Sequence, residues 1–265
     1  MKFSENLPGV LLVCLGVTVL SSCGKVDTST QMGGSIQGTS LSLSGATSTL
    51  AGTAGNSGSA DGTGTSARFN DPNGVTTDGK NLYVADSGNH TIRKVVIATG
   101  EVTTLAGTAG LSGSSDGTST SARFNDPYGI TTDGTNLYVA DSGNHTIRKV
   151  AIAIRVVTTL AGSAGSSGST DNTGTLARFN DPLGITTDGT DLYVTDSGNH
   201  TIRRVVAKVV TAIGDTTTLA GIAGSSGSAD GTGATARFFL PSGITTDGKR
   251  LLVIDTGNNT VRAIE

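Results

Sequence analysis

Aromatic and charged residues are scarce in this sequence, and so are cysteine and proline. The 265 residues include no tryptophan and only two cysteines and five prolines, and charged residues make up 15%. No window sustains apolar residues at i, i+3, i+4 and i+7, which disfavours helical bundles and coiled coils. The formal net charge of −3, with no basic stripe, also disfavours a nucleic-acid-binding protein.

Glycine is abundant, and it bounds short runs rich in β-branched residues. There are 39 glycines, and Gly, Asp and Asn recur between runs of Val, Ile and Thr. This alternation is typical of many short strands joined by tight turns. A hydrophobic content of 35% is too high and too regularly placed for a wholly disordered chain. The sequence therefore predicts an all-β fold.

The first residues predict an exported, lipid-anchored protein. An apolar run of signal-peptide length, residues 7–20, leads into Leu20-Ser21-Ser22-Cys23. This tetrapeptide resembles the lipobox of bacterial lipoproteins, with an ordinary secretory signal as the alternative. The resemblance implies a signal peptide over residues 1–22, lipidation of Cys23, and membrane anchoring at the bacterial cell envelope, facing the periplasm or the exterior. Residues 23–45, poor in apolar side chains, are expected to form a flexible tether.

The rest of the chain, residues 46–265, repeats one unit four times. Leu-Ala-Gly begins at Leu50, Leu105, Leu160 and Leu219, with spacings of 55, 55 and 59 residues. We expect four strands in each unit, which in the first unit cover residues 74–77, 82–85, 91–95 and 102–105. The third strand is the most polar and is expected nearer to solvent. Four antiparallel strands repeated radially are typical of a β-propeller blade.

The two ends of the repeat region are expected to complete one blade. The last unit matches only three strands, whereas residues 47–51 match the fourth strand of the other units. Together they make sixteen strands, which predicts four four-stranded blades. We expect the N-terminal strand to pair with residues 260–264 and close the ring, which would remove the exposed sheet edges.

Two segments of each unit resemble the NHL repeat. In the first unit these are Asp-Pro-Asn-Gly-Val from Asp71 and Leu-Tyr-Val-Ala-Asp-Ser-Gly-Asn-His-Thr-Ile-Arg from Leu82. Threonine replaces the leucine of the family name in three copies, and the fourth copy departs further, with Asn258-Asn259-Thr260. The resemblance implies a β-propeller of NHL repeats over residues 46–265.

The three histidines occupy one position in three successive units. His90, His145 and His200 follow the turn between the second and third strands, and Asn259 stands there in the fourth unit. Three imidazoles suggest a metal site, but radial repetition separates them by one blade each. We therefore expect each histidine to serve its own blade and predict no metal site and no cofactor.

The long connection that precedes each first strand carries an arginine. The four are Arg68, Arg123, Arg178 and Arg237. An ion pair with an aspartate at a fixed position in each copy is the first interpretation, and ligand recognition is the second. The connection lacks both a phosphate-binding pattern and the clustered carboxylates of a calcium loop.

We expect a non-catalytic ligand- or protein-binding scaffold, whose partner is an unidentified protein or glycan at the cell envelope. The predicted binding face carries these arginines and the variable residues after each proline, namely Asn73, Tyr128, Leu183 and Ser242. Tyr128 and Leu183 are the expected apolar anchors. The alternative is a hydrolase or lyase with its active site in the central channel. Near-identical units offer little of the asymmetry that such a site needs.

Overall fold

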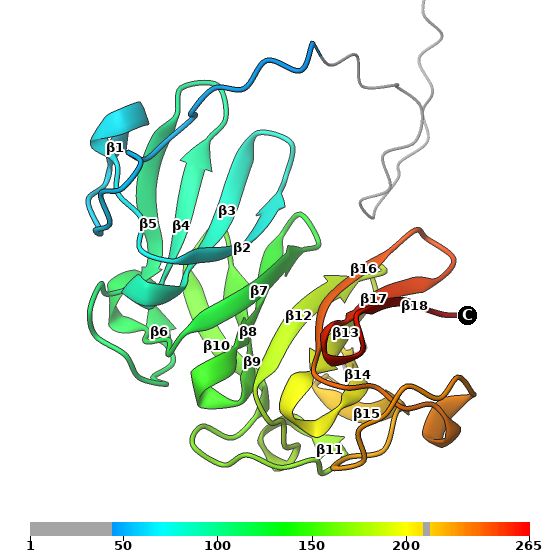
Figure 1. Ribbon diagram of the computed structural model, residues 1–265. Coiled ribbons are helices and arrows are strands. Elements are labelled where there is room, and N and C mark those ends of the chain that lie inside the picture. The colour runs from blue at the N-terminus through cyan, green and yellow to red at the C-terminus, as the bar shows by residue number, and fades with distance from the viewer. Residues whose placement is uncertain (1–43, 209–212) are drawn as a thin grey trace, which may run out of the picture. The chain divides into compact units, whose positions relative to one another are not determined.

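The computed structural model describes residues 44–208 and 213–265 as four antiparallel sheets in chain order (Figure 1). We call these sheets blades 1 to 4. The predicted signal peptide, Cys23 and nearly all of the predicted tether lie outside the described residues. Within the part that is described, no helix has the length and apolar character needed to cross a membrane.

Blades 1 to 3 each contain five strands, one more than the sequence predicts. Blade 1 consists of β1 (Gly62–Thr63), β2 (Pro72–Thr77), β3 (Asn81–Asp86), β4 (Thr91–Val96) and β5 (Glu101–Gly107). Blade 2 consists of β6 (Gly117–Thr118), β7 (Pro127–Thr132), β8 (Asn136–Asp141), β9 (Thr146–Ala151) and β10 (Val156–Gly162). Blade 3 consists of β11 (Asn172–Thr173), β12 (Pro182–Thr187), β13 (Asp191–Asp196), β14 (Thr201–Val206) and β15 (Asp215–Ala220). The additional strands β1, β6 and β11 have two residues each and pair outside the fourth main strand.

Blade 4 contains three strands: β16 (Pro241–Thr246), β17 (Leu251–Asp255) and β18 (Thr260–Ile264). The four-bladed propeller is therefore confirmed, but its predicted closure is wrong. Residues 46–52 form no strand and do not pair with β18. The end of this segment lies on blade 1 instead, where Ala51 packs beside Ala67 and the Gly52 N–H donates to the Gly64 carbonyl at 3.0 Å.

The turns follow from local side-chain chemistry. In the turn after β2, the Asp78 carboxylate accepts the backbone N–H groups of Lys80 and Asn81 at 2.9 and 2.7 Å. A three-residue 3-10 turn then joins the second and third strands of each blade: η2 (Ser87–Asn89), η4 (Ser142–Asn144), η6 (Ser197–Asn199) and η8 (Thr256–Asn258). Four more precede the first strands: η1 (Gly64–Ser66), η3 (Ser119–Ser121), η5 (Gly174–Leu176) and η7 (Gly233–Thr235).

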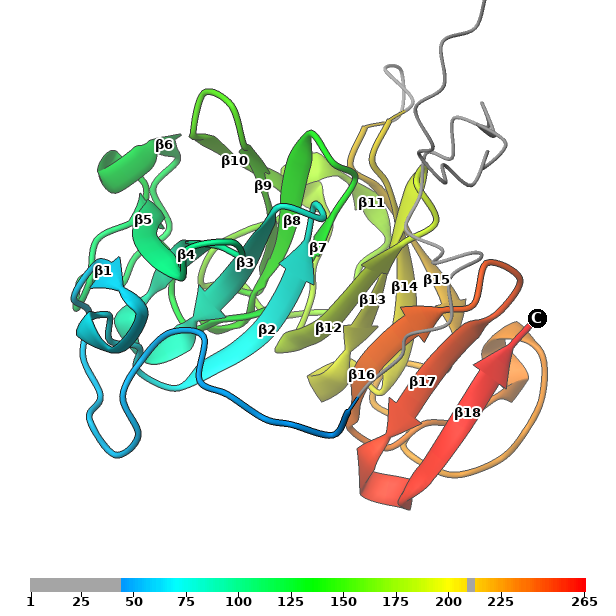
Figure 2. The same cartoon turned by 90° about the horizontal axis from the view of Figure 1, so that it is seen from above.

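The hydrophobic core lies between successive blades. Ile92 and Ala106 of blade 1 pack in one cluster with Phe124 and Leu137 of blade 2, and equivalent clusters join blades 2 and 3 and blades 3 and 4. The first strands contact each other in the order β2, β7, β12, β16, as Figure 2 shows. Within the described residues, no packing of comparable extent joins β16 to β2. Blades 1 and 4 therefore each have one face that no other described blade covers.

The third strand carries a buried arginine, so the expectation that this strand lies nearer to solvent is wrong. The Arg148 side chain is fully buried and donates to Asp141 at 2.8 Å and to Asp116 at 2.9 Å. It also lies over the Phe124 ring. Arg93 and Arg203 make the same contacts in blades 1 and 3. Pairing and hydrogen bonding offset the large desolvation cost of these buried charges.

Candidate functional site

A glycine in each first strand allows neighbouring strands to approach closely. A β-carbon added to Gly129 would collide with the Leu183 carbonyl oxygen of the next blade. Gly74 and Gly184 lie in the same way against the carbonyl oxygens of Tyr128 and Ser242. Only a residue without a side chain fits there, and this contact brings the backbones of the first strands together.

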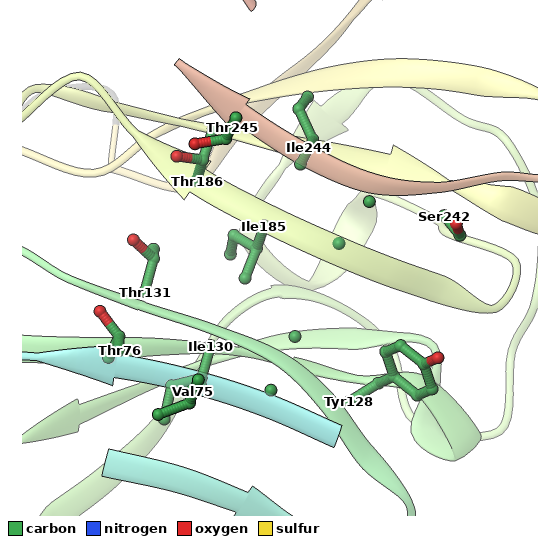
Figure 3. A pocket seen from close by; sticks show the side chains of 14 residues that line it. Val75, Thr76, Tyr128, Ile130, Thr131, Ile185, Thr186, Ser242, Ile244 and Thr245 are labelled. Atoms are coloured by element: carbon green, nitrogen blue, oxygen red, sulfur yellow. The ribbon is translucent and has the colours of Figure 1, made fainter. Parts of the chain in front are cut away.

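The first strands line an open cavity of about 420 Å³, the size of many small-ligand sites. β2, β7, β12 and β16 all contribute to its lining. Figure 3 shows the four threonine side chains, Thr76, Thr131, Thr186 and Thr245, gathered toward one end. Val75, Ile130, Ile185 and Ile244 follow along the strands, and of these Ile130 and Ile185 are largely buried in the hydrophobic clusters between blades. Tyr128 and Ser242 lie toward the other end (Figure 3).

The chemistry of this cavity is that of a neutral, amphipathic site. Its polar side chains are hydroxyls, which both donate and accept hydrogen bonds. None of its fourteen lining residues is Asp, Glu, His, Cys, Lys or Arg. The lining can thus hydrogen-bond a neutral ligand and pack against its apolar face.

The structure separates the four predicted binding residues into two pairs. Tyr128 is half-buried and lines the cavity, as does Ser242, whose hydroxyl is 2.6 Å from that of Thr256. Leu183 is half-buried but does not line the cavity. Asn73 is exposed and donates to the Ser87 hydroxyl at 2.9 Å, also outside the cavity. The sequence repeat makes these positions equivalent, and only the tertiary structure distinguishes them.

The arginines of the long connections anchor their own loops through carbonyl oxygens. Arg68 donates to the carbonyls of Thr65 and Ala67 at 2.5 and 2.7 Å, and Arg178 and Arg237 make the equivalent contacts. Arg123 donates likewise to Thr120 and to Ala122. The expected ion pair is not formed, because none of these four arginines pairs with an aspartate within the described residues. The carboxylate partners in this loop, such as Asp61, bind the buried arginine of the third strand instead.

The histidines join neighbouring blades, so the prediction that each serves only its own blade is wrong. Nδ1 of His90 accepts the Asp126 N–H of blade 2 at 3.1 Å. His145 and His200 accept the N–H groups of Asp181 and Leu240 at 3.1 and 3.2 Å. Sequence comparison of the units missed this role, because it finds equivalent positions but not contacts across blades.

Among the residues that the structure describes, no three His, Cys, Asp or Glu side chains gather as metal ligands would. A channel-sited enzyme would need unlike titratable groups around one centre. The cavity lining does not supply them.

The sequence profile of the NHL repeat matches residues 69–95 and 179–205, in blades 1 and 3. Among curated proteins, NHL repeat-containing protein 2 of Homo sapiens is 36% identical over 151 residues, which is 52% of this chain and 21% of that protein. Protein SUPPRESSOR OF QUENCHING 1 of Arabidopsis thaliana is 32% identical over 149 residues, 52% of this chain and 14% of that protein. The match thus covers about a fifth or less of the length of these relatives.

Two solved structures share the fold. The auxiliary nutrient binding protein of Bacteroides thetaiotaomicron superposes with a TM-score of 0.60 at 22% identity, covering 76% of this chain and 49% of that one. Its counterpart from Bacteroides ovatus has a TM-score of 0.59 at 23% identity, covering 75% and 49%. The chain thus contains two segments that match the NHL repeat, within a β-propeller fold of four blades.

Proposed function

We propose that this protein is a non-catalytic binding scaffold that holds a neutral sugar of a glycan in the cavity between β2, β7, β12 and β16. The observation that carries the proposal is the lining: hydroxyls at both ends, an aliphatic band between them and no charged side chain. A sugar ring presents hydroxyls at its edge and C–H groups on its face, which suits such a lining. The Bacteroides structures, described as nutrient binding proteins, agree with a binding role for this fold.

The direct test is a screen of neutral and charged glycans against the purified mature protein, followed by calorimetry on those that bind. Tyr128→Ala should weaken binding about tenfold or more, because it removes the aromatic group of the cavity. Leu183→Ala is the matched control, since Leu183 occupies the same repeat position outside the cavity. The proposal fails if no neutral glycan binds or if both variants lower affinity equally.

We further propose that the scaffold is anchored to the bacterial cell envelope through a lipid on Cys23, as Leu20-Ser21-Ser22-Cys23 suggests. Mass spectrometry of the mature N-terminus should find an acylated Cys23. A free thiol there, or cleavage at another site, would contradict the anchor without affecting the glycan proposal.

A further inference from the structure

We propose that the ligand of the cavity is a chain of sugars, and that the sugars outside the cavity pack on Phe239 and Leu240. We call these two residues the Phe-Leu pair. The inference rests on the proposed function, since the cavity must first hold one sugar of the chain. It adds the length of the ligand and a second surface that binds it.

The Phe-Leu pair replaces polar residues of the repeat. The other three units carry Asn-Asp before the proline of the first strand, namely Asn70-Asp71, Asn125-Asp126 and Asn180-Asp181. In the fourth unit these positions are Phe239 and Leu240, whose side chains are 39% and 43% exposed. One unit thus presents an aromatic and an aliphatic side chain at the surface where the others present an amide and a carboxylate.

The exposure of the Phe-Leu pair belongs to its position in the blade. Blades 2 and 3 each have a described blade on both sides. Asp126 and Asp181 are exposed there nevertheless, and Asn125 and Asn180 are half-buried. The Phe-Leu pair would therefore also face solvent with a further blade beside blade 4.

The backbone at Leu240 is poorly suited to leucine. Its φ is 48°, in the left-handed region, and Asp126 and Asp181 have φ of 53° at the same position. Aspartate tolerates this conformation better than a bulky apolar residue does. Leucine here costs stability through backbone strain and also exposes apolar surface. A costly residue at one position of a repeat points to a role of its side chain in binding and not in folding.

Neighbouring residues hold the Phe239 ring in place. A β-carbon added to Gly257 would lie 2.5 Å from Cγ and Cδ1 of Phe239, so the ring rests directly on this glycine. The His200 ring meets it edge to face, with the ring centroids 5.6 Å apart and an angle of 73° between the planes. His200 also accepts the Leu240 N–H at 3.2 Å. A ring fixed in this way loses little conformational freedom when a ligand packs on it.

A short path of contacts joins the Phe-Leu pair to the cavity. Ser242 lines the cavity at the end that also holds Tyr128 (Figure 3). The Ser242 hydroxyl is 2.6 Å from that of Thr256, whose neighbour in the chain is the glycine under the Phe239 ring. Leu240 precedes Ser242 by two residues, which places their backbones at most about 7 Å apart. A ligand that leaves the cavity at this end meets these hydroxyls first and the Phe-Leu pair next.

This order of surfaces suits a chain of neutral sugars. Each sugar of such a chain repeats the hydroxyl edge and the C–H face, so its next units can pack on an aromatic and an aliphatic side chain. A stable protein partner needs about 800 Å² of this chain's surface, far more than two partly exposed side chains offer. The exposed carboxylates at the equivalent positions, such as Asp126 and Asp181, disfavour an anionic ligand on this face.

Calorimetry of the mature protein with sugars of increasing length tests the inference. The probes are malto-, cello- and manno-oligosaccharides and any neutral glycan found in the screen above, each from the monosaccharide to the hexasaccharide. We expect affinity to rise about tenfold or more from the monosaccharide to the longer probes. The double variant Phe239→Asn/Leu240→Asp restores the residues of the other three units. It should abolish this rise and leave the affinity for the monosaccharide unchanged.

Leu176→Ser is the matched control. Leu176 is also an exposed leucine, at a position where two other units carry serine, but it lies outside the cavity lining. Its replacement should leave the dependence on length unchanged. An affinity that does not depend on length, or equal losses for short and long probes in the double variant, overturns the inference and leaves the glycan proposal standing. If no probe of any length binds, the proposed function itself fails, and the inference fails with it.

Thermal unfolding separates ligand binding from a role in folding. Because aspartate suits the φ at position 240 better than leucine does, Leu240→Asp should melt at the same temperature as the wild type or higher. A lower melting temperature would show that the leucine stabilises the blade, which would contradict its assignment to a ligand.

Discussion

The interior of the blade array and its two ends have nearly the same sequence but very different surroundings. Arg148 is fully buried in blade 2, whereas the equivalent Arg262 of blade 4 is 12% exposed. Ala140 is fully buried, and Ile254 at the same position of blade 4 is 45% exposed. The comparison shows that a residue's burial here depends on whether another blade lies against it, because a blade buries its faces on its neighbours and not within itself.

The largest expected difference concerns the buried arginine. Arg148→Met leaves Asp141 as an uncompensated buried charge and should cost about 3–5 kcal/mol of unfolding free energy. Arg262→Met should cost less, because its ion pairs reach solvent through the exposed Asp230 carboxylate. Urea denaturation at a dilution where no association is detected measures both. Equal losses would mean that covering a blade does not alter the strength of its ion pairs.

The next comparison concerns the glycine of the first strand. In Gly129→Ala the new methyl group meets the backbone carbonyl of Leu183, which should cost about 1–3 kcal/mol of stability. In Gly243→Ala it meets only the Ile254 side chain, at 3.1 Å, which can move toward solvent. We expect a near-wild-type melting temperature for Gly243→Ala. A similar loss in both variants would show that the glycine serves the strand conformation and not the contact between blades.

A smaller difference is expected at the histidine position. His145 and Asn259 both have left-handed backbone conformations, with φ of 59° and 57°, so replacing either by Ala costs similar backbone strain. Only His145→Ala also removes a bond to the next blade, at the Asp181 N–H. It should therefore lose about 1 kcal/mol more than Asn259→Ala in thermal or urea unfolding. Equal losses of stability in the two variants would show that the His145 side chain does not stabilise the contact between blades 2 and 3.

The last comparison concerns pH, which separates buried from exposed carboxyls. Burial raises the pKa of Asp141 and Asp196 to about 6 against the lowering effect of Arg148 and Arg203. As the pH falls, these two carboxyls are therefore protonated in the native state before they are protonated in the unfolded state. The stability that this protonation contributes is fully present below pH 4 and is lost as the pH rises through 6. In the exposed turn, hydrogen bonds from Asn81, Lys80 and Tyr83 outweigh the effect of burial and lower the pKa of Asp78 to about 2. Its stabilisation is present above pH 4 and is lost toward pH 2.

We therefore expect the urea midpoint to rise as the pH falls from 7 to between 4 and 5, and then to fall toward pH 2. Asp78→Asn should make the fall toward pH 2 smaller by the share of this one carboxyl, because Asp133, Asp188 and Asp247 also have lowered pKa values, and it should leave the rise near pH 6 unchanged. A midpoint that falls steadily from pH 7 would contradict the raised pKa of the two buried carboxyls.

Much of the fold could be predicted from local pattern. The Asp-Gly turns and the β-branched runs predicted β2 to β5 within two residues at each end, because turn geometry and strand alternation are short-range properties. The two-residue strands β1, β6 and β11 were missed, since they lie in Gly- and Ser-rich segments and form only by pairing with a distant edge. The burial of Arg93 was missed for a similar reason: Asp61 and Asp86, which neutralise it, come from elsewhere in the blade.

By itself the sequence determined the repeat, the number of blades and the turn that ends each strand, because these depend on residues close together in the chain. Only the tertiary structure decided which equivalent residues face the cavity, with Tyr128 lining it and Leu183 outside it. It also decided where residues 46–52 lie and which blade faces are covered. These outcomes depend on which blade surfaces come into contact. The four units have similar sequences and therefore similar surfaces, so the sequence of a unit does not specify which of its faces is covered.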